Sequence, residues 1–169
     1  MRRAATAAGA VALLAVAGGG WYMAPRPVRE TLAGVQYRTG HPGARTVRVT
    51  VAVRGTVWRA LDGAQTFRGI LRLTGATRPN PDNDRPLTVH FGPDGLGVMA
   101  YAYYTDGRGI VRAYGVLFAG GGLRDIVILV GNWSAADGLT IAAPATGRRQ
   151  ALRVSSALMK RWLNGYVLH

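Results

Sequence analysis

Histidine, serine and aspartate together can form a hydrolytic site, and this sequence offers one such combination. His90 lies on a predicted strand, and Ser134 lies three residues before Asp137. In such a site the histidine would take the serine proton and the aspartate would orient the histidine. No glycine-flanked nucleophile elbow surrounds Ser134, which favours an ordinary turn serine. An exported hydrolase that uses His90 with Ser134 or Asp137 is therefore the alternative to a non-enzymatic protein.

Few residues of the chain are suited to other catalytic mechanisms or to metal binding. The chain has eight acidic side chains, and half of them belong to Asp-Gly pairs that predict turns. Asp82 and Asp84 are close neighbours, but Arg85 follows them and no glutamate closes a calcium loop, so we expect an ordinary surface loop. The three histidines lack zinc-ligand spacing, and the absence of cysteine excludes thiolate chemistry and disulfides. We predict no catalytic residues, no metal site and no cofactor.

A set of aromatic and cationic residues is better suited to binding than to catalysis. If the Asp-Gly turns are two residues long, one sheet face carries five candidate binding residues: His90, Tyr101, Tyr103, Arg112 and Tyr114. Tyrosine and arginine offer flat, amphipathic surface and are enriched at recognition sites. The alternative, which we favour, is a second core layer in which Arg112 stacks on Tyr101.

A separate basic face is predicted on two strands near the start of the domain. Its members share the solvent-facing parity of those strands: Arg48, Arg54, Arg68 and Arg72. The chain has 21 Lys and Arg against 8 Asp and Glu, and its formal net charge is +13. Such a field favours anionic partners. We expect an anionic envelope polymer, lipid headgroups or another envelope protein as the partner, and nucleic acid less than these.

An N-terminal apolar segment precedes these strands. From Ala4 to Ala24 the chain has 21 residues without a charge, preceded by two arginines and followed by Pro25. As a helix this segment would be ~31 Å long, enough to cross a bilayer. We predict a signal anchor at residues 1–24, inserted in the membrane through residues 4–24, with the rest of the chain outside the cytoplasm. The alternative is a signal peptide cleaved near Ala17, followed by secretion.

The remaining chain has the length of one domain. Residues 25–43 lack sustained periodicity and are interpreted as a linker, whereas residues 44–169 form a single β-rich globular domain. Asp-Gly pairs at 62–63, 94–95 and 106–107 separate apolar runs and predict hairpins. Treated as two-residue turns, they place three pairs of residues opposite each other: Trp58 and Phe67, Phe91 and Val98, and Ala102 and Val111.

This register gathers small residues on one face of the sheet: Val98, Ala100, Ala102, Ala113 and Gly115. Apolar residues at helical spacing predict a C-terminal helix from about residue 147 to 164, with Thr146 as N-cap and Gly165 just beyond its end. We expect this helix to pack on the small-residue face. The predicted fold class is α+β: mainly an antiparallel β meander with a C-terminal helix on one face, plus the N-terminal transmembrane helix.

Several short motifs carry a resemblance. They are Phe67-Arg68-Gly69, Trp133-Ser134-Ala135-Ala136-Asp137-Gly138, Ile141-Ala142-Ala143-Pro144-Ala145, Arg149-Gln150-Ala151 and Leu158-Met159. Through them the chain resembles a group of small, uncharacterised, membrane-anchored bacterial proteins. The resemblance covers the domain from about Val47 to the end. It implies an extracytoplasmic β domain closed by a C-terminal helix, and it carries no activity or site that could be transferred.

Overall fold

A single antiparallel sheet of eight strands dominates the structure. The computed structural model describes residues 22–120 and 122–169. The strands are β1 (Arg26–Arg38), β2 (Val47–Arg59), β3 (Gln65–Thr74), β4 (Leu87–Phe91), β5 (Leu96–Thr105), β6 (Arg108–Gly120), β7 (Asp125–Val130) and β8 (Leu139–Ala143). Two helices follow them, α2 (Arg148–Leu158) and α3 (Lys160–Leu163). The predicted antiparallel β architecture with a C-terminal helix is confirmed.

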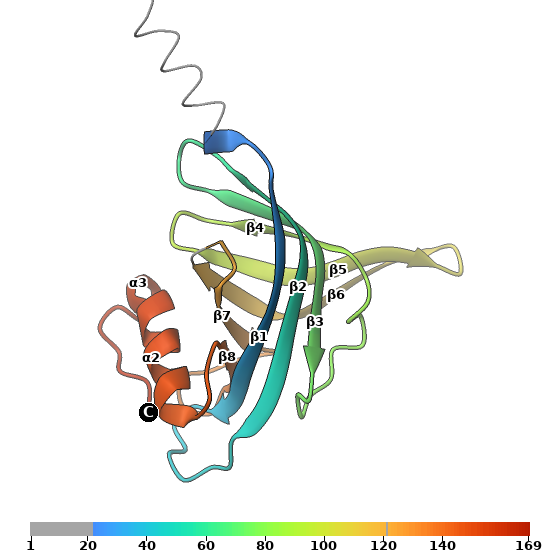
Figure 1. The fold of residues 1–169 in the computed structure, drawn as a ribbon. Helices are drawn as coiled ribbons and strands as arrows, with labels where there is room; N and C mark the ends of the chain where they lie inside the picture. Colours follow the sequence, from blue (N-terminus) through green and yellow to red (C-terminus); the bar gives the residue numbers. More distant parts are fainter. Residues whose placement is uncertain (1–21, 121) are drawn as a thin grey trace, which may run out of the picture.

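The sheet curls into a nearly closed barrel. Its order is β4-β3-β2-β1-β8-β7-β6-β5, so the first strand lies between β2 and the last strand. The edge strands β4 and β5 follow each other in the chain and are joined by a tight turn, in which Gly92 N–H donates to Leu96 C=O at 2.9 Å. This turn brings the two edges together (Figure 1). All eight strands thus belong to one curved sheet, not to two packed layers.

The expected membrane anchor falls almost wholly within residues 1–21, outside the described residues. No helix in the described part of the chain is both long and apolar enough to cross a membrane.

Side chains fill the interior of the barrel. Alternate residues of β2 point inward and are buried, as their predicted alternation requires: Val49, Val51, Val53 and Val57. Phe67, Leu71, Met99, Leu117 and Ile128 join them from four other strands. This interior forms the main hydrophobic core.

The helices lie on the outer surface of the barrel, over β7, β8 and β1. A second apolar cluster joins Met159 and Ala151 of the helical segment to Phe118, Val127 and Ala142 of the sheet. Gly147 is the N-cap, without a side-chain bond, while the Gln150 side chain accepts hydrogen bonds from Thr146. The helix therefore forms where predicted, but Thr146 is not its N-cap residue.

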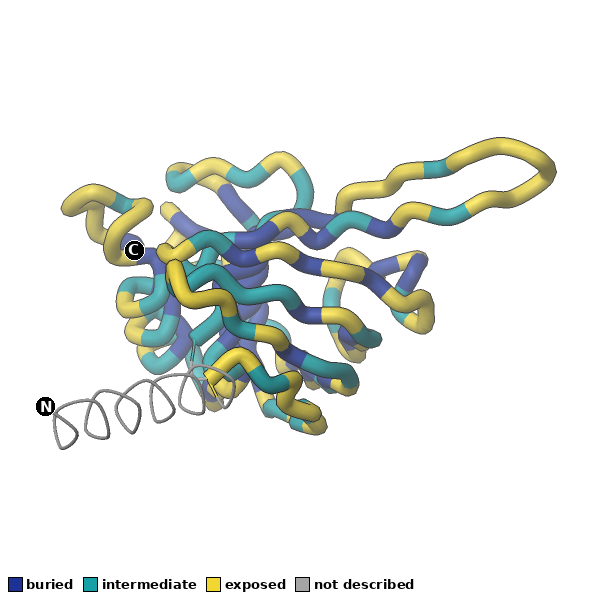
Figure 2. Tube along the Cα trace, turned by 90° about the horizontal axis from the view of Figure 1, so that it is seen from above, coloured by how far each residue is buried: buried dark blue, intermediate teal, exposed yellow. Residues whose placement is uncertain are grey.

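The expected docking place of the helix was wrong. The small-residue face of β5 and β6 remains largely exposed, and beyond the barrel the two strands continue as a projecting ribbon (Figure 2). Val111 on this ribbon is 77 % exposed. The helix instead packs over β1, β7 and β8, where Val35, Val127 and Ala142 contribute to the apolar cluster beneath it. The pattern of small residues alone did not show which sheet surface the helix could reach.

The predicted linker, residues 25–43, is also corrected, because most of it is β1. This strand pairs with β2 over eleven positions and with β8 over four. Its inward positions include Glu30, between Val28 and Leu32, and Gly34, which follows Leu32. A carboxylate and a glycine on the inward side hide the alternation that would reveal a strand.

The hairpin turns explain which register predictions succeeded. At Asp106-Gly107 both residues have positive φ, 49° and 72°, as a two-residue type I′ turn requires, and Ala102 lies opposite Val111 as predicted. At 62–63 and 94–95 the loops have three residues and end with a glycine of positive φ. The shift of one residue pairs Phe67 with Val57 instead of Trp58. The same shift at 94–95 directs Phe91 into the barrel interior, whereas Val98 is exposed.

A bulge corrects one further position. Ala100 lies opposite Ala113, as expected, but the register shifts between Met99 and Ala100, so that Gly115 pairs with Met99. Gly115 therefore leaves the face shared by Ala100 and Ala113.

Candidate functional site

The predicted aromatic and cationic face is not one exposed surface. Tyr101 and Tyr114 point into the barrel and are buried, and Tyr103 is half-buried. Arg112 lies directly across from Tyr101, as predicted. The stacked pair is a different one, because the guanidinium carbon of Arg85 lies 3.9 Å from the Tyr103 ring centroid. These residues therefore form the end of the core, which agrees with the core-layer interpretation.

The segment that covers this end of the barrel is the loop between β3 and β4, residues 75–86. Asn80 is buried and donates from Nδ2 to the Tyr101 hydroxyl at 2.7 Å. The Tyr114 hydroxyl donates to the Arg78 carbonyl at 2.7 Å. Burial raises the pKa of both tyrosines to about 12, so both phenols stay neutral at physiological pH. This loop is a cover and not the ordinary surface loop that was expected.

A buried carboxylate fixes the covering loop to the sheet. Asp82 Oδ1 lies 3.2 Å from Arg85 Nε, and its Oδ2 accepts from Arg112 Nη1 at 3.2 Å. The neighbouring Asp84 is exposed and pairs with Arg72. Both carboxylates of the loop thus contact arginines, and these ion pairs give each carboxylate a structural role.

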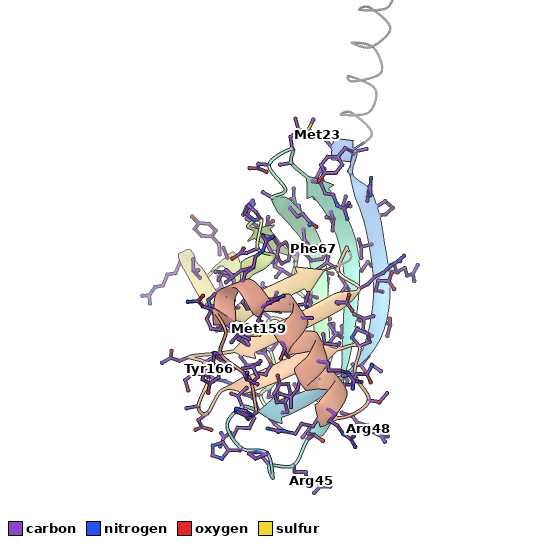
Figure 3. All side chains as sticks on the ribbon, turned by 90° about the vertical axis from the view of Figure 1, so that its left-hand side faces the viewer. Met23, Arg45, Arg48, Phe67, Met159 and Tyr166 are labelled. Atoms are coloured by element: carbon purple, nitrogen blue, oxygen red, sulfur yellow. The ribbon has the colours of Figure 1, made fainter. Side chains whose placement is uncertain are left out.

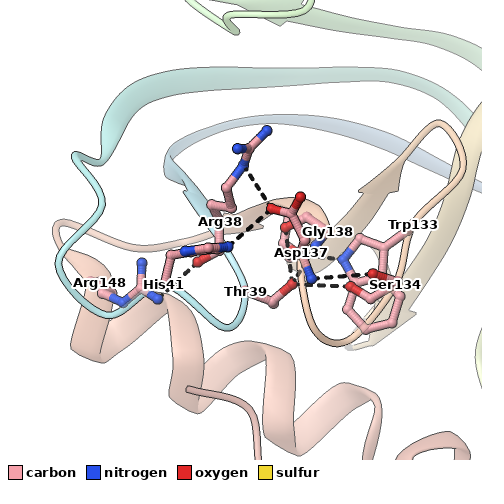
Figure 4. Close-up of polar contacts among 9 residues, drawn as sticks. Arg38, Thr39, His41, Trp133, Ser134, Asp137, Gly138 and Arg148 are labelled. Atoms are coloured by element: carbon pink, nitrogen blue, oxygen red, sulfur yellow. Dashed lines mark hydrogen bonds and ion pairs between the residues drawn. The ribbon is translucent and has the colours of Figure 1, made fainter.

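The structure does not bring together the residues of the alternative hydrolase. His90 lies on the outer face of β4, where its Nδ1 is 3.1 Å from Thr66 Oγ1. Ser134 Oγ accepts from the Asp137 backbone N–H, in the loop between β7 and β8 (Figure 4). The Asp137 carboxylate contacts His41 Nε2 and Arg38 Nε, both at 3.2 Å. In the described residues Asp137 therefore pairs with a histidine other than His90, and Ser134 serves as a turn serine.

The predicted basic residues, in contrast, do share one surface. Arg48 and Arg54 on β2 and Arg68 and Arg72 on β3 alternate with buried inward residues, and all four are exposed. Figure 3 shows Arg48 near the end of the barrel opposite Met23, so the set extends along the strands. Arg29 on β1 lies directly opposite Arg54 and extends the surface by one strand. We call these five arginines the basic face.

Four of the five members form no ion pair in the part of the chain that the structure describes. Within residues 22–120 and 122–169, Arg72 pairs with Asp84, but no carboxylate pairs with Arg29, Arg48, Arg54 or Arg68. A shallow groove of about 220 Å³ crosses the middle of the face between Arg29, Arg54 and Arg72, with Ala52 and Ile70 among its lining. The groove gives the cations a partly apolar floor.

One member of the basic face and one residue beside it were not placed there by the sequence analysis. Arg29 was assigned to a linker, and only the pairing of β1 with β2 places it beside Arg54. His90 was grouped with Tyr101, but the three-residue turn at 93–95 puts it on the outer face. The pairing of β4 with β3 then places it opposite Thr66, close to Arg68.

Comparisons of the chain with models of protein families, with curated proteins and with solved structures gave no match. In the described part of the chain no three metal-ligating side chains lie together.

Proposed function

We propose that this chain is a non-enzymatic binding module outside the cytoplasm, held at a membrane by its N-terminal segment, that binds an anionic envelope polymer through the basic face. The observation that carries the proposal is the direct pairing of Arg29 with Arg54, neither of which forms an ion pair within the described residues, since the nearby Glu30 pairs with Arg124. Like charges directly opposite each other destabilise a sheet. A bound polyanion would relieve this repulsion.

The layout of the basic face suits a chain of repeating charges. Arg29 and Arg54 lie opposite each other on neighbouring strands, about 5 Å apart. Arg68 and Arg72 are separated by about 13 Å along β3, and Arg48 and Arg54 by about 20 Å along β2. Exposed guanidinium groups distributed in this way can contact separate phosphate or carboxylate groups of one polymer, each with two parallel hydrogen bonds. A drug-sized ligand would instead need a larger pocket, whereas this groove holds only about 220 Å³.

Polyphosphate binding by the full chain in neutral detergent tests the proposal. We expect the triple variant R29Q/R54Q/R68Q to bind at least tenfold more weakly, because each arginine contributes charge-assisted hydrogen bonds. The salt dependence should also flatten, by up to about one unit of log Kd per log salt for each arginine removed.

The matched control is R108Q/R149Q/R153Q, which removes the same charge at exposed positions on the ribbon and on α2. It should change binding less than threefold by loss of net charge alone. Equal weakening of the two variants would contradict a specific role for the basic face, and so would wild-type binding that is insensitive to salt.

A further inference from the structure

A second basic site lies at one mouth of the barrel, where β1 begins and β2 ends. A pocket of about 450 Å³ opens there between the strands and the turn from β6 to β7. Three of its four arginines come from different elements: Arg26 from β1, Arg59 from β2 and Arg124 from the turn. Glu30 is the single acidic residue of the lining. We call this the mouth pocket.

Two of these arginines have the inward parity of their strands. Arg26 pairs with Val57, which is buried in the barrel core, and Arg59 follows Val57 by two residues on the same face. At most inward positions of β2 the chain uses valine. Arg26 is exposed at the rim, whereas Arg59 is partly buried, and its buried part requires a counterion or a hydrogen-bond acceptor.

The Arg59 side chain lacks such an acceptor in the described chain. Its Nε atom is buried and makes no hydrogen bond. Its guanidinium lies beside the β6–β7 turn, since a Cβ added to Gly122 would be 3.9 Å from Arg59 Nη2. A buried donor without a partner costs free energy, which a ligand acceptor would recover.

The turn itself is held in a conformation that costs free energy. Leu123 is buried in the core with a φ of 71°, a region that branched and bulky residues rarely adopt. Such strain persists where the surroundings require it, and it recurs at ligand-binding sites. Here it directs Arg124 back across the pocket, where its Nε lies 3.3 Å from Glu30 Oε1.

We propose that the mouth pocket binds a phosphate group, as a monoester or a diester, between Arg26, Arg59 and Arg124. Guanidinium groups bind phosphate oxygens through paired, charge-assisted hydrogen bonds, and the pocket volume exceeds that of one phosphate with its ester substituent. Glu30 holds Arg124 while the pocket is empty and competes with the ligand. Arg29 lines this pocket as well as the basic face, whereas Arg26, Arg59 and Arg124 belong to the mouth pocket alone, so the test below replaces Arg26 and Arg124 and keeps Arg29.

Met23, just upstream of β1, lies at the same end of the barrel as this pocket, whereas Arg45 lies at the opposite end (Figure 3). A chain tethered through its N-terminus would hold the mouth pocket close to lipid headgroups. The phosphate could therefore belong to a headgroup or to a soluble molecule, and the two sources need separate measurements.

The test measures the full chain with inorganic phosphate by calorimetry, and with vesicles of phosphatidylglycerol or phosphatidylcholine by co-sedimentation. We expect R26Q/R124Q, at two exposed positions, to weaken phosphate binding about tenfold. E30Q should strengthen it about threefold, because the competing carboxylate is removed. A purely structural role for these side chains would not give opposite signs.

The matched control is R45Q/R108Q, which lowers the net charge equally at exposed positions away from the mouth. Phosphate binding lost only in R26Q/R124Q supports a soluble ligand. No phosphate binding, but a preference for phosphatidylglycerol that R26Q/R124Q abolishes and the control keeps, supports a headgroup. If neither ligand distinguishes R26Q/R124Q from the control, the proposal is overturned.

Discussion

Asp82 shows how a single residue can fix the cover of the barrel. Its side chain is 3 % exposed, and it contacts Arg85 and Arg112, each about half exposed. A buried carboxylate is stable in this position only while its cationic partners supply hydrogen bonds, since desolvation alone would be costly. The partners remain in water on their other side, which limits the strength of the contacts.

We expect Asp82→Ala to lower the free energy of unfolding by about 2 kcal/mol, because the covering loop loses both contacts and two arginines lose their acceptor. The control is Asp84→Ala, which removes an exposed pair with Arg72 and should cost no more than about 0.5 kcal/mol. Urea denaturation of both variants measures the difference. Equal destabilisation would mean that burial of Asp82 has no special role.

At the level of elements, α2 docks through small residues. Ala151 is fully buried against the outer surface of the sheet, and Ser155, one turn later, accepts from the Tyr37 hydroxyl at 2.8 Å. Burial raises the pKa of Tyr37, so this hydroxyl keeps its proton and donates it. Close packing of this kind leaves little room for a larger side chain.

Ala151→Leu should therefore destabilise the protein by roughly 1–3 kcal/mol, since the added atoms force the helix away from the sheet. Ala157→Leu adds the same atoms on the exposed side of the same helix and should change stability by less than about 0.5 kcal/mol. Thermal unfolding followed by circular dichroism compares the two. A neutral Ala151→Leu variant would show that the helix is loosely attached.

Element type was more predictable than element placement. The valine alternation of β2 and the helical spacing after Gly147 reflect burial within one element, which sequence periodicity reports directly. Register depends on turn length instead. Pro93 before Asp94-Gly95 marks a three-residue loop, because its fixed φ suits the first position of a type I turn, with the αL glycine last. Proline is not required for such a loop, because Leu61-Asp62-Gly63 forms one too, while Asp106-Gly107 forms the two-residue turn.

Residues of the candidate site could be predicted where their position depends on one strand alone, and not where it depends on contacts between distant parts of the chain. Arg54 and Arg68 follow from strand parity alone. Arg29 required knowledge that β1 is a strand and that it pairs with β2, which is a contact between distant parts of the chain. The mouth pocket depends on three such contacts, so no local pattern could indicate it.

In the whole molecule, the residues that stabilise the barrel differ from those that are proposed to bind ligands. The apolar interior and the covering loop bury Tyr101, Tyr114 and Asp82. Arginines without an ion pair in the described residues lie on the outside of β1–β3 and at one mouth, and also on the ribbon and on α2. The formal net charge of +13 is thus concentrated in part on surfaces where cations face each other. An anionic partner, as proposed above, would offset this repulsion, from which the fold itself gains nothing.

Side-chain NMR of the arginine Nε–H groups during titration with polyphosphate tests the central claim most directly. Assigned signals of Arg29, Arg54 and Arg68 should shift together and saturate at one ligand concentration, while those of Arg108 and Arg149 stay in place. Equal small shifts at all exposed arginines, or shifts confined to the ribbon and α2, would contradict the basic face as the binding surface.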